Sequence, residues 1–241
     1  MRGLEEMSVL VTGAGRGIGL AVTERLTEEG ALVAAADLTD PVACEGAKAR
    51  LSGDVTSEED VARILDEAWD ALEGVDALVL CAGIHWVGPT HEMAPDDFDR
   101  VLAVSARGTF LCCRAALPRM VDRESGHILT FGSTAAVAGA PGLTAYAAAK
   151  GAVLQMTRSI AAEYAPIGIR ANCLCPGATN TPLLRELMAD REDPQKFRDA
   201  HPIGRFAEPE EIAAAAAWLL SDDASYMVGA TVMCDGGFTT V

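Results

Sequence analysis

The chain has 241 residues, and half of them are apolar, so it can bury a sizeable core. Acidic residues outnumber basic residues by 35 to 19, which gives a formal net charge of -16. A surface this acidic repels phosphate backbones and anionic lipids, so we expect neither nucleic acid nor membrane as a partner. The longest apolar run, residues 212–220, is about half of a membrane span. No linker or internal repeat interrupts the sequence, which favours one domain over residues 1–241.

The seven cysteines form an odd set without the spacing of a disulfide framework. Five of them lie in strongly apolar stretches, which is typical of buried reduced thiols in a cytosolic protein: Cys81, Cys112, Cys113, Cys173 and Cys175. No second ligand cluster accompanies the last two, so we expect no metal site. Glu5 and Glu6 precede only a short apolar run, unlike the basic start of a signal peptide. We therefore expect a cytoplasmic location.

Apolar runs and helical spacings alternate along the chain. Short continuous apolar runs predict buried strands over residues 7–12, 31–36, 77–81, 127–131, 170–175 and 231–234. Apolar residues at helical spacing predict helices over residues 18–29, 61–72, 98–120, 145–164 and 212–220. This alternation indicates an α/β protein with a doubly wound parallel sheet, the Rossmann fold, as a single domain. Ligands of such sheets bind beyond the carboxyl ends of the strands.

A glycine cluster over residues 13–19 ends the first predicted strand and opens the first helix. Glycines allow a tight turn there, and the free N–H groups of a helix N-terminus favour a pyrophosphate. The strand–turn–helix context predicts a dinucleotide site that includes Gly13, Arg16, Gly17 and Ile18. The spacing is G-x-x-x-G-x-G rather than the commoner G-x-G-x-x-G.

Asp37 follows the second predicted strand, where an acid can accept both ribose hydroxyls of NAD and repel the 2′-phosphate of NADP. Arg16 is an opposing signal, because a cation in the glycine loop can hold a 2′-phosphate. The acid should dominate, since a like-charge contact in a partly desolvated site costs several kcal/mol. The sequence therefore favours NAD over NADP.

Tyr146 and Lys150 lie on one predicted helix, and their i, i+4 spacing places both side chains on the same face. A phenol is a poor base at neutral pH, and an adjacent ammonium favours the phenolate form. The pair therefore predicts a general acid/base. Ser133 follows the strand that ends near residue 131, where its hydroxyl can hydrogen-bond the substrate oxygen. These three residues are the predicted catalytic groups.

Further segments complete the pattern: Asp54-Val55, Cys81-Ala82-Gly83 and Pro176-Gly177 with Thr181. In this order and spacing the chain resembles the short-chain dehydrogenase/reductase family from Val9 to about Gly237. The resemblance implies hydride transfer between a nicotinamide cofactor and a secondary alcohol or ketone. It also implies cofactor contacts by these residues: Asp54, Val55, Ala82, Gly83, Tyr146, Lys150, Pro176, Gly177, Thr179 and Thr181.

Three features depart from the family pattern. Leu80 and Cys81 stand where the family usually has two Asn residues, whose amides steady that strand end. Ser105 stands where the family usually has an Asn that anchors a proton-relay water, so we include Ser105 among the catalytic candidates. The stretch between Asp37 and Asp54 is short and contains Pro41, which predicts a stunted crossover helix and a more open adenine side.

The resemblance also implies a substrate lid, over about residues 182–203, and a homotetramer. We expect the contacts between subunits to come from two long helices. The expected residues are Phe110, Leu111, Ala115, Ala116 and Met120 on the first helix and Ala152, Met156 and Ile160 on the second. His85 and Trp86 are candidates for the substrate mouth. Two other functions stay open: an NADP-dependent 3-oxoacyl thioester reductase that would use acyl-carrier protein, and a cofactor-binding protein without turnover. The identity of the small-molecule alcohol or ketone is open as well.

Overall fold

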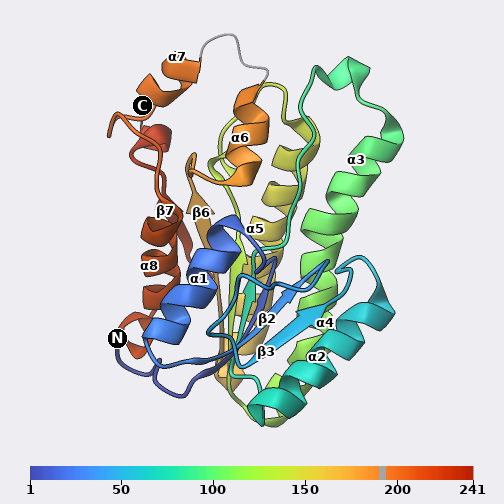
Figure 1. The fold of residues 1–241 in the computed structure, drawn as a ribbon, viewed down its shortest axis with the longest axis vertical. Helices are drawn as coiled ribbons and strands as arrows, with labels where there is room; N and C mark the ends of the chain where they lie inside the picture. The colour runs from blue at the N-terminus through green and yellow to red at the C-terminus, as the bar shows by residue number, and fades with distance from the viewer. Residues whose placement is uncertain (190–193, 241) are drawn as a thin grey trace.

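The computed structural model describes residues 1–189 and 194–240. Seven parallel strands form one sheet in the order β3-β2-β1-β4-β5-β6-β7. In chain order they are β1 (Ser8–Thr12), β2 (Leu32–Asp37), β3 (Ala49–Ser52), β4 (Ala77–Leu80), β5 (Gly126–Phe131), β6 (Ile169–Pro176) and β7 (Thr231–Cys234). The chain winds outward from β1 in both directions, which confirms the predicted doubly wound sheet and single domain (Figure 1).

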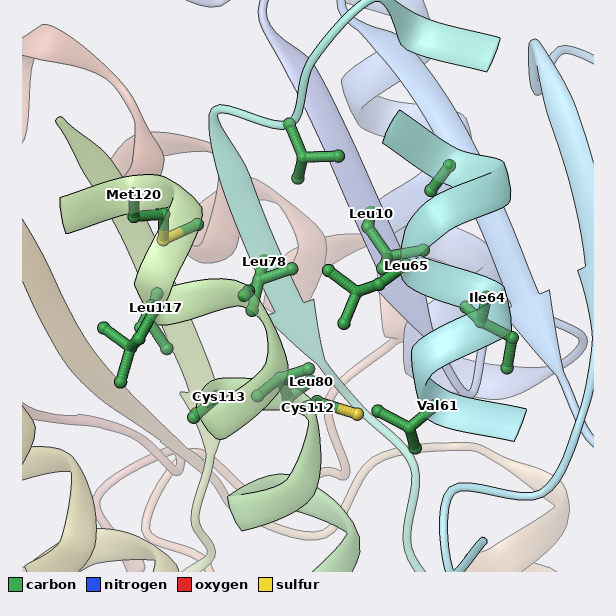
Figure 2. Close-up of a cluster of buried hydrophobic side chains, with 14 of the residues drawn as sticks. Leu10, Val61, Ile64, Leu65, Leu78, Leu80, Cys112, Cys113, Leu117 and Met120 are labelled. Atoms are coloured by element: carbon green, nitrogen blue, oxygen red, sulfur yellow. The ribbon is translucent and has the colours of Figure 1, made fainter. Parts of the chain in front are cut away.

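Helices cover both faces of this sheet. On one face α1 (Gly17–Glu28) packs beside α8 (Pro209–Leu220), and on the other lie α2 (Glu58–Leu72), α4 (Gly108–Asp122) and α5 (Thr144–Tyr164). Figure 2 shows side chains of α2 and α4 meeting over the strands, with Cys112 and Cys113 among them. The seven cysteines are all free, and only Cys81 and Cys234 are not fully buried. In the described part of the chain no group of three His, Cys, Asp or Glu side chains would hold a metal ion.

The predicted helix over residues 98–120 is longer and less regular than expected. α3 (Pro95–Leu102), a π-helical turn (Ala103–Arg107) and α4 form one continuous helix. By length and composition this helix could cross a membrane, but half of its apolar stretch is buried inside the fold, as in a core helix. The π turn contains Ser105, whose carbonyl accepts the Thr109 hydroxyl at 2.9 Å. A π turn changes which residues face the sheet, and it brings Ser105 to the site.

Between β2 and β3 the described residues 38–48 form turns and no helix, so the predicted stunted crossover helix is absent altogether. Above the carboxyl ends of the strands, at the top of Figure 1, lie the short helices α6 (Pro182–Ala189) and α7 (Pro194–Asp199). They occupy the region of the predicted lid over residues 182–203, of which residues 190–193 lie outside the described chain.

Candidate active site

The glycine loop is in close contact with two other predicted cofactor segments. A Cβ atom on Gly13 would lie 2.7 Å from the backbone nitrogen of Ala82, and one on Gly17 would lie 3.2 Å from a methyl carbon of Thr181. A Cβ atom on Gly19 would lie only 2.0 Å from the Gly13 carbonyl oxygen. Both Gly13 and Gly17 also have positive φ, so glycine is required for conformation as well as for space. The fold thus brings together segments that are far apart in the sequence.

The N-terminus of α1 has no side-chain cap, because Arg16 is at the N-cap position and makes no capping hydrogen bond. The first N–H groups of α1 are therefore available to an anion, and this cradle fits a pyrophosphate. The Arg16 side chain is mostly exposed and lies 3.8 Å from the carboxylate of Glu186. The Asp37 carboxylate accepts the Gly15 N–H at 2.8 Å, which fixes the acid against the glycine loop.

Asp54 and Val55 lie just beyond β3, on the adenine side of the predicted site. The Asp54 carboxylate accepts the Thr56 N–H at 2.8 Å. Val55 packs on the core and occupies the space that a Cβ atom on Gly108 would need, at 2.8 Å. Neither residue lines the enclosed part of the site.

A cavity of about 790 Å³ opens at the carboxyl ends of the strands. It is lined by nine of the predicted site residues: Ile18, Gly83, Ser133, Tyr146, Lys150, Pro176, Gly177, Thr179 and Thr181. The other predicted site residues lie outside its lining: Gly13, Arg16, Gly17, Asp37, Asp54, Val55, Ala82 and Ser105. The cavity therefore corresponds to the reactive half of the predicted site, and the glycine loop and Asp37 to the outer half.

Ser133, Tyr146 and Lys150 meet in this cavity. The Lys150 ammonium is buried, donates to the Phe131 carbonyl at 2.7 Å and lies 5.7 Å from the centre of the Tyr146 ring. The Ser133 hydroxyl accepts the Ala135 N–H at 3.2 Å, which leaves its own O–H able to donate. The arrangement supplies a hydroxyl donor, a phenol and a buried cation around one space.

Ser105 lies beside this group but behind the cavity wall. Its buried hydroxyl accepts the Ile84 N–H at 3.1 Å and donates to the Ile84 carbonyl at 3.2 Å. A Cβ atom on Gly83 would lie 3.4 Å from the Ser105 oxygen and 3.5 Å from the Lys150 nitrogen. Ser105 and Lys150 thus border one small space that exists because residue 83 is glycine.

Leu80 and Cys81 stand at the end of β4, where the family pattern has two Asn residues. Cys81 lines the cavity, and burial raises the pKa of its thiol, so the thiol stays protonated at neutral pH. The Cys81 N–H still donates to the Thr12 carbonyl at 3.1 Å, which keeps the ends of β4 and β1 together. The backbone thus retains one of the bonds that steady this strand end.

The structure adds cavity residues that sequence reasoning missed. His85, a candidate for the substrate mouth, lines the cavity. His201 and Phe238 line it too, although the sequence singled out neither. The His201 ring lies 4.8 Å from the Phe238 ring and its Nδ1 is 3.0 Å from the Phe197 carbonyl oxygen. No local pattern links residues so far apart, so only the fold reveals that the C-terminal turn helps to build the site.

Comparison with known proteins agrees with this geometry. Residues 13–239 match a family model described as Enoyl-(Acyl carrier protein) reductase. The chain is 38% identical to 2-(S)-hydroxypropyl-CoM dehydrogenase 3 of Xanthobacter autotrophicus, over 99% of this chain and 98% of that protein. It is 40% identical to 2,5-dichloro-2,5-cyclohexadiene-1,4-diol dehydrogenase of Sphingobium indicum, over the full length of both.

Solved structures give the same result. A 3-ketoacyl-(acyl-carrier-protein) reductase from Brucella melitensis, in complex with NADH, superposes with a TM-score of 0.92 at 35% identity, over 98% of this chain and 100% of that one. With the uncapped glycine loop, the Ser133–Tyr146–Lys150 group and a family match over nearly the whole length, the chain belongs to the short-chain dehydrogenase/reductase family of nicotinamide-dependent oxidoreductases.

Proposed function

We propose that this protein is an NAD-linked dehydrogenase in which Tyr146 is the acid/base and Ser133 and Lys150 assist it. The protein is an oxidoreductase that transfers hydride between a nicotinamide cofactor and a secondary alcohol or ketone. The observation that carries the finer assignment is the buried Lys150 ammonium beside the Tyr146 ring, in one cavity with Ser133.

The residues present fit the dinucleotide. The open N–H groups of α1 would hold the pyrophosphate, Asp37 the adenosine ribose, and Thr179 and Thr181 the nicotinamide carboxamide. When bound, the nicotinamide ring supplies the hydride acceptor or donor. Pro176 and Gly177 lie along the same wall of the cavity.

The proton chemistry belongs to the chain itself. The Ser133 O–H donates to the substrate oxygen, and the Tyr146 oxygen takes the alcohol proton or returns it to the ketone. Lys150 keeps one donor on the Phe131 carbonyl, and its remaining two donors can reach the ribose and a water molecule. Its charge, buried 5.7 Å from the centre of the Tyr146 ring, favours the negative charge that develops on the Tyr146 oxygen during proton transfer.

Two contacts support NAD over NADP. Asp37 is held against the glycine loop by the Gly15 N–H, so it cannot swing away from a 2′-phosphate without breaking that bond. Arg16, the cation that would hold a 2′-phosphate, faces Glu186 instead. A 2′-phosphate would therefore meet a fixed carboxylate and a cation that is already shared.

Titration of NADH and NADPH against the protein, followed by cofactor fluorescence, tests this preference. We expect NADH to bind at least tenfold more tightly, which corresponds to about 1.4 kcal/mol. Asp37→Ala should narrow the difference, because it removes both the ribose acceptor and the repulsion. Asp40→Ala, which removes an exposed acid close by, is the matched control. Tighter binding of NADPH to the unchanged protein would overturn the assignment.

We also propose that α6 and α7 act as the substrate lid, and that the protein is a cytoplasmic homotetramer. Free cysteines throughout the chain support a reducing compartment. Of the residues expected at subunit contacts, Phe110 on α4 is half exposed and supports an interface there. Leu111, Ala116, Met120 and Ile160 are buried in the core of the single chain, so their expected role at the interface is wrong. A thioester reductase remains the second candidate, because the Brucella structure carries that name.

A further inference from the structure

The described lining of the cavity differs in charge from the chain as a whole. Acids outnumber bases by 35 to 19 in the sequence, yet no Asp or Glu is among the described residues that line the cavity. The ionisable side chains other than Tyr146 and Cys81 in that lining are all basic: His85, Lys150, Lys196 and His201. A cavity of this kind in so acidic a protein is suited to an anion.

Two of these four groups already have a role. Lys150 belongs to the catalytic group. His201 is buried, bonds the Phe197 carbonyl through Nδ1 and packs against Phe238, so it builds the wall. His85 and Lys196 remain, His85 on the loop after β4 and Lys196 on α7. Burial lowers the pKa of His85, which disfavours its cationic form.

Two acids in the described part of the lid, Glu186 and Asp199, have other contacts. Glu186 on α6 lies 3.8 Å from Arg16, and Asp199 on α7 accepts the Gln195 side chain at 2.7 Å. Neither carboxylate lines the cavity. Lys196 lines the cavity on a helix whose own described acid, Asp199, is hydrogen-bonded to Gln195.

We propose that the substrate of this site carries a carboxylate or a similar oxyanion besides its secondary alcohol, and that Lys196 binds that anion. This inference rests on the proposed dehydrogenase function. Lys196 has a contact within the protein as well, and an ammonium with three donors can keep that contact while it binds a substrate oxygen.

The cavity walls indicate what joins the two ends of such a substrate. On one side the wall is built of small residues, Ala135, Ala138, Gly139 and Ala140, and on the lid side Leu183 and Leu187 face it. These walls offer apolar contact and few hydrogen bonds. We therefore expect a compact hydrocarbon, either a ring or a short chain, to join the alcohol at Tyr146 to the anion at Lys196.

The test compares alcohols that differ only in charge. The probes are 4-hydroxycyclohexanecarboxylate and its methyl ester, and 3-hydroxybutyrate and its methyl ester, each oxidised with saturating NAD. We expect kcat/KM to favour the acid over its ester by about tenfold or more in at least one pair, mainly through KM. Rising salt should reduce this ratio, because part of the attraction is exposed to solvent.

The chain contains only three lysines, which supplies a matched control. Lys196→Met should reduce the acid-to-ester ratio to near one, and Lys196→Arg should keep most of it. Lys48→Met removes the same charge from a shallow, open depression beside β3, where Asp40, Glu45 and Arg50 surround it, and it should keep the full ratio. A ratio near one in the unchanged protein, or one that survives Lys196→Met, would overturn the inference.

An equilibrium measurement separates this inference from the proposed function. Binding of each acid and ester to the NADH-loaded protein is followed by NADH fluorescence, which needs no turnover. Tighter binding of the acid, lost in Lys196→Met, upholds the anion site even if neither alcohol is oxidised, and the dehydrogenase assignment alone would then fail. Oxidation of acids and esters at equal rates, with equal binding, upholds the dehydrogenase and removes the anion site.

Discussion

A cation lies at each end of the parallel sheet, buried at one end and half-buried at the other. Lys150 lies at the carboxyl ends of the strands and donates to the carbonyl of Phe131, the last residue of β5. Arg170 lies at the amino ends, where its guanidinium bonds four carbonyls at 2.8–3.4 Å, those of Leu219, Leu220, Ser221 and Ala224. The two cations therefore differ in how many of their donors the protein uses.

This difference separates a functional cation from a structural one. Arg170 is held between His127 and the end of α8, and it adds a charged donor to carbonyls at the end of that helix and in the turn after it. Lys150 has one recorded acceptor among the described residues and faces a cavity, so it can serve a ligand. Phe131 pairs with Leu174, four residues beyond Arg170 on β6, so about 13 Å of strand separates the two anchoring positions, and changes at one end should leave the other intact.

The largest effect is expected at the carboxyl end. Tyr146→Phe should lower kcat by about 10²–10⁴-fold at unchanged NADH affinity, because the acid/base is lost while the cofactor contacts remain. Steady-state kinetics and NADH titration measure the two quantities. Tyr226→Phe, at a fully exposed tyrosine, is the control and should keep full activity. A Tyr146→Phe variant that kept more than about a tenth of the rate would show that another group moves the proton.

At the amino end we expect loss of stability without loss of activity. Arg170→Met should lower the free energy of unfolding by about 3 kcal/mol, because several partly buried carbonyls lose a charged donor. For a chain of this length the melting temperature should fall by roughly 6–12 °C. Arg100→Met breaks only an exposed contact with Asp97 and should change stability by about 0.5 kcal/mol or less.

If Arg170 is purely structural, its loss should change stability and leave catalytic activity unchanged. At 25 °C the kcat/KM of the folded Arg170→Met variant should lie within about twofold of the wild-type value, since the cavity lies at the opposite edge of the sheet. A tenfold loss of kcat/KM in the still-folded variant would show that the two ends are coupled.

His127, beside Arg170, should make the stability of the amino end of the sheet depend on pH. Burial and the neighbouring Arg170 lower the pKa of His127 to about 4, against the attraction of Asp222 and Asp76. The unfolded chain therefore binds a proton between pH 6.5 and 4 that the folded chain does not. This group alone should reduce the free energy of unfolding by about 3 kcal/mol as pH falls through that window.

Denaturant unfolding at pH 7, 5.5 and 4 measures that slope. His127→Gln keeps a neutral donor for the Leu220 carbonyl, which lies 2.9 Å from Nδ1 of His127, and cannot be protonated. The variant should lose stability less steeply than the wild type below pH 6.5. Parallel curves for the two proteins would contradict the assignment of this pH dependence to His127.

Strands were predicted where burial alone determines the pattern. β1 and β2 are continuous apolar runs, and their bounds agree with the prediction within two residues. β3 was not predicted as a strand, because Ala49–Ser52 lies at the edge of the sheet with Arg50 exposed and has no apolar run to reveal it. The π turn in the long helix was also missed, because the contact between Ser105 and Ile84 across the fold accompanies it.

The site residues also divide into those that the sequence predicts and those that it does not. Residues that follow strand ends, such as Ser133 and Thr181, were predictable because the fold places all strand ends together. The Tyr146–Lys150 pair was predictable from helical spacing. His201 and Phe238 were not, since their neighbourhood depends on how the C-terminal turn packs under α7. Lys196 was missed for a similar reason, because a charged residue in a short helix resembles any solvated surface position.

The smallest expected effect on activity concerns Ser105. Like Arg170 it bonds the backbone, and like Lys150 it borders the catalytic site. Its one proton is committed to the Ile84 carbonyl and one lone pair to the Ile84 N–H, so one lone pair remains. A water in the space beside Gly83 can donate to that lone pair and accept from Lys150. Ser105 can then orient a relay water but cannot itself pass the proton onward.

Ser105→Ala should therefore lower kcat by about threefold to tenfold, the value of one hydrogen bond of 0.5–1.5 kcal/mol, if proton release limits turnover. Ser105→Asn should restore the rate, provided the longer side chain fits beneath Gly83. The assay is kcat against pH for the three proteins, in H₂O and D₂O, with melting temperatures alongside. A lower melting temperature with an unchanged pH profile in Ser105→Ala would show that the hydroxyl only satisfies the Ile84 backbone. The proton from Tyr146 would then leave through Lys150 by a path that does not involve Ser105, and the small space beside Gly83 would be a feature of packing rather than of catalysis.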